Sequence, residues 1–291
     1  MHTTILITGA TGTVGQEVVK HLAMLDSDVR IRAGVHSVIK GENLKRLPDV
    51  EIVEMDFEDQ DSLHAAFTHV DKVFLITPFE EDQVQMAKTL VDEAKRTGVK
   101  HIVRLSALGA DAEPGIQLGR WHREIEKYIE DSGISYTFLR PASFMQNFVT
   151  YSDKSIKEEG RFYQSKGEGK VAYIDTRDIA AVAVEALIGE GHEGKIYELT
   201  GPEALSNDDV AQIISEVTGK QVAYVDVPVQ EAKLVMKEQG VPEKLADALV
   251  ELDEVYKAGY SNEVNDEVQY VTGKKPHSFK QFVADYKECF V

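Results

Sequence analysis

Residues 5–15 read Ile-Leu-Ile-Thr-Gly-Ala-Thr-Gly-Thr-Val-Gly, a short apolar run that leads directly into three glycines spaced by three. Helical periodicity follows at once, with Val14, Val18 and Leu22 on one face. A strand, a glycine-rich turn and a helix in this order are typical of a pyrophosphate-binding βα unit. The stretch therefore predicts a dinucleotide site at the start of the chain.

The three glycines have different predicted tasks. Gly9 permits the tight turn, Gly12 lets the backbone approach a phosphate without a Cβ in the way, and Gly15 allows the helix to pack closely on the strand. The helix N-terminus adds unpaired N–H groups and the positive end of a dipole. The expected phosphate-binding residues are Gly9, Thr11, Gly12, Thr13, Val14 and Gly15.

Short β-branched runs alternate with helical periodicity through residue 200, which indicates repeated βαβ units and a parallel sheet. The expected strands are Thr4–Thr8, Val29–Val35, Val50–Glu54, Lys72–Ile76, His101–Leu105, Ser135–Arg140 and Lys195–Leu199. Helices are expected between them, the first over Thr13–Met24 and a later one over Trp121–Glu130. The fold class is therefore α/β, a Rossmann-type doubly wound parallel sheet over residues 1–200.

The pattern changes past residue 200, where strand and helix alternate less clearly. Asn207-Asp208-Asp209 offers an N-cap for a helix over Val210–Val217, and Gly219 closes that helix. A strand over Gln221–Val227 and a helix over Pro242–Lys257 are expected to follow. We expect residues 201–291 to form a smaller C-terminal α/β lobe that covers the substrate and shares some strands with the first domain.

Composition excludes several classes of function. The 32 Lys and Arg against 50 Asp and Glu give a net charge of -18, which disfavours binding to nucleic acid or to an anionic membrane. The single cysteine, Cys289, allows neither an intrachain disulfide nor a thiolate metal cluster. The sequence has no apolar run of about 18 residues and no signal-peptide pattern. We expect a cytoplasmic protein.

The glycine spacing G-x-x-G-x-x-G resembles that of the extended and atypical short-chain dehydrogenase/reductases. Within them the chain resembles the NmrA-like group, which includes NAD(P)H:quinone reductases and redox-sensing regulators. The order and separation of further motifs carry this resemblance over nearly the whole chain. Those motifs are Ile31–His36, Met55–Asp59, Leu105–Ala107, Ser132–Ile134, Leu139–Pro141 and Phe144–Phe148.

The resemblance implies that Asp56 hydrogen-bonds the adenine amino group while Phe57 lies against the ring. The physical reading agrees, because a carboxylate accepts an N–H donor and a residue just past a parallel strand points into the ligand crevice. Alternatively, Asp56 caps the helix that begins near Gln60. Thr77 and Pro78, at the end of the fourth strand, look like the shelf beside the nicotinamide ribose.

The second strand bears on the choice between the two nicotinamide cofactors. No acidic residue lies between Val29 and Lys40, where one would bind the ribose hydroxyls and repel a 2′-phosphate. Arg32 and His36 occur there instead, and a cationic group makes charge-assisted hydrogen bonds to a phosphate. NADP is therefore favoured. NAD stays possible, because relatives often have arginine at the position of His36 and an imidazole is mostly uncharged near neutral pH.

Typical members of the superfamily use Ser, Tyr and Lys, with the last two spaced Y-x-x-x-K. Ser106 matches the serine, but Leu118 stands at the tyrosine position and His122 at the lysine position. His122 is the best remaining proton shuttle, because imidazole titrates near neutral pH. Alternatively, His122 simply hydrogen-bonds the cofactor ribose or a nearby carboxylate.

The residues after the sixth strand are candidates for the rest of the site. Pro141 is expected to contact the cofactor, and Phe144, Asn147 and Phe148 are expected to line an apolar pocket for a flat acceptor. Alternatively, the two phenylalanines, four residues apart, belong to the core, and Trp121 has the same ambiguity. No H-x-x-x-H or G-x-S-x-G pattern occurs, so neither a metal site nor acyl transfer is expected.

The sequence thus predicts an NAD(P)H-dependent oxidoreductase that transfers hydride to a quinone or a similar small planar acceptor. The competing hypothesis is a non-catalytic NADP(H) redox sensor that regulates a protein partner. A sugar-nucleotide epimerase is disfavoured, because it relies on the tyrosine and lysine that Leu118 and His122 replace.

Overall fold

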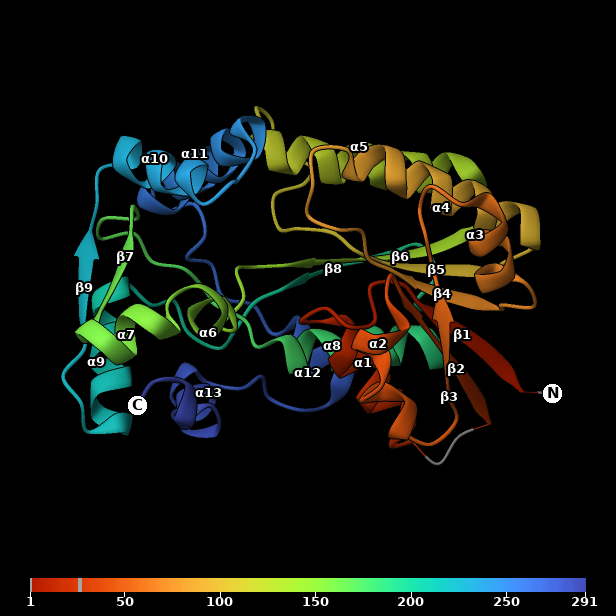
Figure 1. Ribbon diagram of the computed structural model, residues 1–291, viewed down its shortest axis with the longest axis horizontal. Coiled ribbons are helices and arrows are strands. Elements are labelled where there is room, and N and C mark those ends of the chain that lie inside the picture. The colour runs from red at the N-terminus through yellow and green to blue at the C-terminus, as the bar shows by residue number, and fades with distance from the viewer. Residues whose placement is uncertain (1, 26–27) are drawn as a thin grey trace. The chain divides into compact units, whose positions relative to one another are not determined.

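A computed structural model describes residues 2–25 and 28–291 (Figure 1). Its main sheet has seven strands in the order β3-β2-β1-β4-β5-β6-β8, and each neighbouring pair from β3 to β6 is parallel. The strands are β1 (Thr3–Ile7), β2 (Val29–Val35), β3 (Val50–Glu54), β4 (Lys72–Leu75), β5 (His101–Leu105), β6 (Ser135–Pro141) and β8 (Lys195–Leu199). The strand order reverses between β1 and β4, which is where an open parallel sheet binds its ligand.

The predicted α/β fold is confirmed, and every predicted strand of this sheet lies within one residue of the observed one. The first helix is shorter than expected. α1 runs over Gly15–Ala23 instead of beginning at Thr13, because residues 9–14 form the turn between β1 and the helix.

Helices cover both faces of the sheet (Figure 1). α3 (Gln60–Phe67), α4 (Gln83–Thr97) and α5 (Gln117–Ser132) lie on one face, and α1, α2 (Val38–Gly41) and α8 (Thr176–Ile188) lie on the other. On the first face one buried cluster joins Leu75 and Phe138 of the strands to Leu90 of α4 and Ile125 of α5. Each such side chain contributes roughly 1.5–3 kcal/mol when it leaves water, so this packing holds the strand ends in place.

The chain divides into two compact units that are discontinuous in sequence. One comprises Met1–Asp111, Gly119–Arg140 and Ile179–Tyr197, and the other comprises Ala112–Leu118, Pro141–Asp178 and Glu198–Val291. The sequence predicts one boundary near residue 200. The second unit reaches back to Pro141 because Phe148 and Phe162 share a core with Ile214 and Phe279.

The second unit contains a pair of parallel strands, β7 (Arg161–Gln164) and β9 (Ala223–Asp226), where the sequence predicts a strand over Gln221–Val227. Its helices are α6 (Asn147–Tyr151), α7 (Asp153–Glu159), α9 (Asn207–Thr218), α10 (Val229–Glu238), α11 (Glu243–Lys257), α12 (Glu267–Thr272) and α13 (Phe279–Asp285). The predicted helix over Pro242–Lys257 is α11, with Pro242 at its N-cap. The expected N-cap of α9, within Asn207–Asp209, lies one to three residues too late, because Ser206 caps the helix through a reciprocal pair of hydrogen bonds with Asp209.

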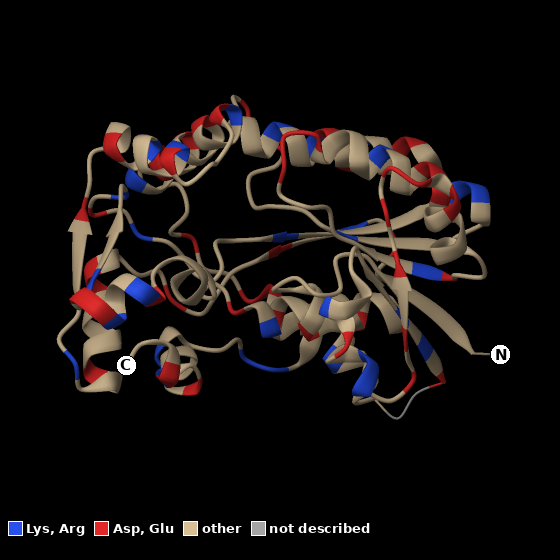
Figure 2. Cartoon of the chain, in the orientation of Figure 1, with Lys and Arg blue, Asp and Glu red and all other residues tan. Residues whose placement is uncertain are grey.

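Charged residues of both signs follow one another along α5 and α11 (Figure 2). No helix within residues 2–25 and 28–291 is long and apolar enough to cross a membrane. The same residues hold no group of three or more His, Cys, Asp or Glu side chains placed to bind a metal ion.

Candidate functional site

The turn after β1 has the geometry that its glycines predict. Gly9 has a φ of 59°, and its carbonyl accepts a hydrogen bond from the Gly12 N–H over 2.9 Å. A Cβ on Gly15 would lie 2.2 Å from the Gly9 oxygen, so Gly15 permits close packing against the turn itself rather than against the strand. Thr11, Gly12 and Thr13 are exposed, whereas Val14 is buried at the N-cap of α1.

No side chain caps the N-terminus of α1. The positive end of the helix dipole therefore lies beside an exposed glycine turn, which is the arrangement that accepts a phosphate. Thr8, which was not among the predicted site residues, joins this turn to the end of the neighbouring strand β4. Its hydroxyl donates to the Ile76 carbonyl over 2.6 Å and accepts from the Ile76 N–H over 2.7 Å. The residues present thus fit a dinucleotide.

The two predicted phosphate-binding cations differ in their surroundings. Arg32 donates from Nη1 to the carbonyl oxygens of Ala66 and Thr68 over 2.9 and 2.8 Å, and its Nε faces Glu51. These hydrogen bonds join β2 to the end of α3, so the Arg32 guanidinium already has partners within the protein. His36 follows the last residue of β2 and is exposed. Of the two predicted residues, His36 is the one placed to meet a phosphate at the end of the strand.

The residues after β3 settle one alternative. The helix-capping role considered for Asp56 is wrong, because Asp59 is the N-cap of α3 and accepts hydrogen bonds from the Asp61 and Ser62 N–H groups. The Asp56 carboxylate accepts one hydrogen bond, from the Glu58 N–H over 2.9 Å. Asp56 and Phe57 are both partly exposed. A carboxylate with spare acceptor capacity beside an aromatic ring suits an adenine.

Thr77 and Pro78 follow the end of β4, and both are partly exposed. The Thr77 hydroxyl accepts a hydrogen bond from Nη2 of Arg104 over 3.2 Å. No sequence motif predicted a role for Arg104. The available signal was a charged residue inside the otherwise apolar end of the strand His-Ile-Val-Arg-Leu.

Ser106 is not free to act on a substrate in this arrangement. Its hydroxyl donates to Oε1 of Glu126 over 2.7 Å. Arg140 donates to both oxygens of Glu126, over 2.9 and 2.8 Å, and also pairs with Asp111 over 2.7 Å. Arg123 contacts the same carboxylate over 3.1 Å. Glu126 is fully buried, so the network joins α5 to the ends of β5 and β6.

His122 lies one turn after Leu118 on α5. Its Nδ1 is buried without a hydrogen-bond partner, and burial together with the positive charge of Arg104 lowers the pKa of His122 to about 3. At neutral pH the ring is therefore uncharged. Because an imidazolium is needed for acid catalysis, the predicted role of His122 as a proton shuttle near neutral pH is disfavoured. An uncharged imidazole still donates a hydrogen bond through its N–H.

A Tyr-x-x-x-Lys spacing does occur once elsewhere, at Tyr270 and Lys274. This pair does not replace the tyrosine and lysine whose positions Leu118 and His122 take on α5. α12 ends at Thr272, and Gly273 turns the chain with a φ of 71°, so the two side chains do not stand one helical turn apart.

The residues predicted to line an acceptor pocket belong to the second unit. Phe148 is 1% exposed, and its ring packs edge-on against those of Phe162, Tyr173 and Phe279. Its role is therefore in the core, and the pocket prediction is wrong for Phe148. Phe144 and Asn147 are partly exposed, whereas Pro141 is buried at the end of β6.

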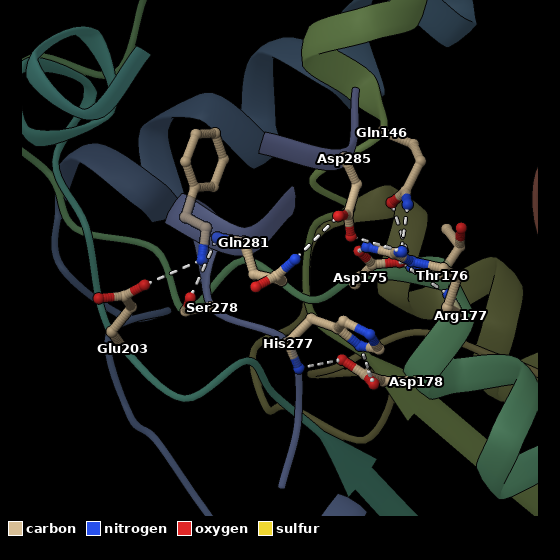
Figure 3. Close-up of polar contacts among 11 residues, drawn as sticks. Gln146, Asp175, Thr176, Arg177, Asp178, Glu203, His277, Ser278, Gln281 and Asp285 are labelled. Atoms are coloured by element: carbon tan, nitrogen blue, oxygen red, sulfur yellow. Dashed lines mark hydrogen bonds and ion pairs between the residues drawn. The ribbon is translucent and has the colours of Figure 1, made fainter. Parts of the chain in front are cut away.

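A second polar cluster lies at the start of α8 (Figure 3). Arg177 pairs with Asp175 and with Asp285 over 2.7 and 2.8 Å. Asp178 accepts from the backbone N–H of His277 over 2.8 Å and contacts its Nδ1 over 2.7 Å. These contacts hold α13 and the segment before it on the start of α8. These contacts therefore have a structural role within the second unit.

A family model described as the NmrA-like family matches residues 1–287. The chain belongs to the NmrA-like family. The NAD(P)H azoreductase of Xenophilus azovorans is 41% identical over 286 residues, which cover 98% of this chain and 99% of that protein. This result confirms the family that the motifs indicate.

Two solved structures of NmrA-like fold are also similar. The NADPH-dependent quinone oxidoreductase of Escherichia coli, complexed with NADPH, has a TM-score of 0.85 at 30% identity, covering 97% of this chain and 99% of that one. The triphenylmethane reductase of Citrobacter has a TM-score of 0.84 at 30% identity, covering 98% and 99%. The Escherichia coli enzyme is named for NADPH, and the Citrobacter enzyme has also been solved in complex with NADP(H).

Proposed function

We propose that this NmrA-like protein is an NAD(P)H-dependent reductase that transfers hydride to a quinone or to a similarly conjugated, planar acceptor, with NADPH as the preferred cofactor. One observation carries the proposal. The exposed glycine turn before α1 fits a pyrophosphate, whereas α5 carries Leu118 and an uncharged His122 at the positions that a tyrosine acid and its lysine take in typical members of the superfamily.

Each part of the cofactor has a proposed contact. The turn from Gly9 to Gly15 and the N-terminus of α1 hold the pyrophosphate, and His36 meets the 2′-phosphate. Asp56 and Phe57 take the adenine. Thr77 and Pro78 contact the nicotinamide ribose. The reduced nicotinamide supplies the hydride when it is bound.

The absence of a tyrosine at Leu118 and of a charged imidazole at His122 supports one class of acceptor. Reduction of a simple ketone forms a strongly basic alkoxide, which needs a positioned proton donor. The oxygens of a reduced quinone are weakly basic, so water can supply the proton. The His122 ring then orients the acceptor by donating a hydrogen bond.

The names of the relatives support this class. They are an azoreductase, a quinone oxidoreductase and a triphenylmethane reductase, each named for the reduction of a conjugated compound. A conjugated acceptor spreads the negative charge that hydride brings, which lowers the need for an acid.

The test is oxidation of NADPH by the purified protein with a panel of quinones and azo dyes, and with simple aliphatic ketones as the control. We expect turnover with the conjugated acceptors and little with the ketones. Binding of NADPH without any turnover above the buffer rate would reject the reductase. That outcome would favour the sensor, and the search would turn to a protein partner that binds according to the redox state of the nucleotide.

A further inference from the structure

Arg104 is a buried cation at the carboxyl end of β5. Its side chain is 2% exposed. Nη1 donates to the Leu75 carbonyl over 3.0 Å and Nη2 donates to the Thr77 hydroxyl over 3.2 Å, while Nε is buried without a partner. The guanidinium thus holds the end of β4, the strand whose last residues lead into the proposed nicotinamide shelf.

No carboxylate forms an ion pair with Arg104 within the described part of the chain. Other buried or half-buried arginines are paired, Arg140 with Glu126 and Asp111 and Arg177 with Asp175 and Asp285. Glu126 is the acidic group that acts on Arg104 from α5, but it is already hydrogen-bonded by Ser106, Arg123 and Arg140.

Arg104 nevertheless stays charged. Burial lowers the pKa of Arg104 to about 10, which is still far above neutral pH. Hydrophobic residues of similar volume often replace buried charges without loss of stability, so folding alone does not require a guanidinium here. A buried charge that has a perturbed pKa, forms no ion pair and lies beside a ligand edge is a candidate for function.

We propose that Arg104 makes the cofactor site discriminate between the two redox states of the nicotinamide, favouring the uncharged reduced ring over the cationic oxidised ring. The inference rests on the proposed function, in which Thr77 contacts the nicotinamide ribose. NADPH and NADP⁺ carry the same adenine, riboses and phosphates, so every other contact affects both forms nearly equally. The two forms differ in the charge of the nicotinamide ring, and the Arg104 guanidinium repels the ring when it is positively charged.

The expected size follows from the distance. Arg104 Nη2 lies 3.2 Å from the Thr77 hydroxyl, so a ring whose ribose contacts Thr77 lies within several ångströms of the guanidinium. Two positive charges at about 7 Å in a medium of effective dielectric constant about 20 repel each other enough to weaken binding by roughly tenfold or more. The site would therefore release NADP⁺ readily and resist inhibition by it.

The experiment compares two dissociation constants in each of three proteins. Calorimetric titration without an acceptor gives Kd for NADPH and for NADP⁺ in the wild type, Arg104→Met and Arg104→Lys. We expect the wild type to bind NADPH at least about tenfold more tightly. Arg104→Met should reduce this ratio at least threefold, and Arg104→Lys, which keeps the charge, should preserve it.

Two further variants control for other causes. Thr77→Val removes the hydrogen bond but leaves the charge, so it should weaken both nucleotides while keeping their ratio. If Arg104→Met does not fold, Arg104→Gln carries the same comparison, because its amide still donates to the Leu75 carbonyl.

The possible failures are distinct. A folded neutral variant with the wild-type ratio, or a wild type that binds NADP⁺ as tightly as NADPH, overturns the role of Arg104. Failure to bind either nucleotide instead overturns the proposed cofactor site.

Discussion

The hydroxyl of Ser106 donates to Oε1 of Glu126 over 2.7 Å, from the end of β5 to the buried face of α5. The position of Ser106 in the sequence matches the catalytic serine of typical short-chain dehydrogenases. In this chain its partner is instead a carboxylate that Arg140 already holds by both oxygens. The serine therefore stabilises a buried network.

Ser106→Ala should change quinone turnover by no more than a few-fold and lower the free energy of unfolding by about 0.5–1.5 kcal/mol, the usual value of one hydrogen bond. Steady-state kinetics and urea unfolding give the two quantities. Glu126→Gln is the matched comparison, because it breaks a buried ion pair and should cost about 3–5 kcal/mol. A hundredfold loss of turnover in Ser106→Ala, with stability unchanged, would return the serine to a catalytic role.

Two histidines, the buried His101 and the partly exposed His122, should make the protein sensitive to acid. Burial, with a smaller effect of Lys72, lowers the pKa of His101 to about 4, and the pKa of His122 is lowered to about 3. Because both folded-state values lie below the unfolded value of about 6.5, stability is present above pH 6.5 and is lost as pH falls towards 4 and 3. His122→Gln should remove up to about 1.4 kcal/mol per pH unit from this slope.

Denaturant unfolding at half-unit intervals between pH 4.5 and 7.5 measures that slope. The same pKa of His122 predicts that turnover shows no ionisation of this residue between pH 5 and 9. An acidic limb in that range that disappears in His122→Gln would mean that the ring is protonated during the reaction after all.

His36→Arg should increase the preference for NADPH over NADH by about tenfold, because a guanidinium carries a permanent charge and can make two charge-assisted hydrogen bonds to the 2′-phosphate. Calorimetric titration with both nucleotides gives the ratio. Arg32→Met is the control and should leave the ratio unchanged, since the Arg32 guanidinium of the wild type is bound to the Ala66 and Thr68 carbonyls. Loss of the preference in Arg32→Met would place the phosphate nearer to Arg32.

Two glycine variants should separate binding from folding. Gly12 is exposed, and a Cβ there would lie 3.2 Å from the Gly9 oxygen, so Gly12→Val should abolish binding of both cofactors with only a modest decrease in the thermal midpoint. In Gly15→Ala the new Cβ would meet the Gly9 oxygen at 2.2 Å, so the turn must shift and stability should fall as well. Titration and thermal unfolding of both proteins test this contrast, and equal destabilisation of the two would contradict it.

The contacts between α8 and the segment before α13 should stabilise the protein less at alkaline pH. The hydrogen bond from His277 to Asp178 raises the pKa of His277. A raised folded-state value means that the stabilisation is complete below the unfolded value of about 6.5 and is lost as pH rises through the folded value. Asp178→Asn should remove this dependence. The difference in thermal midpoint between wild type and variant should therefore shrink from pH 6 to pH 9; a constant difference would refute the ionic contribution.

Local features of the sequence were enough for the scaffold of the site. The strand β1, the turn at Gly9 and the start of α1 follow from an apolar run, a residue that tolerates positive φ and a 3.6-residue period. These properties belong to neighbouring residues. The positions of His36, Asp56 and Thr77 then follow, because each lies one or two residues past the end of a parallel strand.

The sequence by itself thus determined the sheet, the glycine turn at its edge and the family. Only the tertiary structure decided which polar groups are already engaged. Arg32 is held by carbonyls 34 and 36 residues away, Ser106 by a carboxylate 20 residues away, and Arg104 by oxygens 29 and 27 residues away. Partners this distant leave no periodic signal. Burial and charge compensation depend on the packed neighbourhood, which is why the roles of these three residues emerged only from the fold.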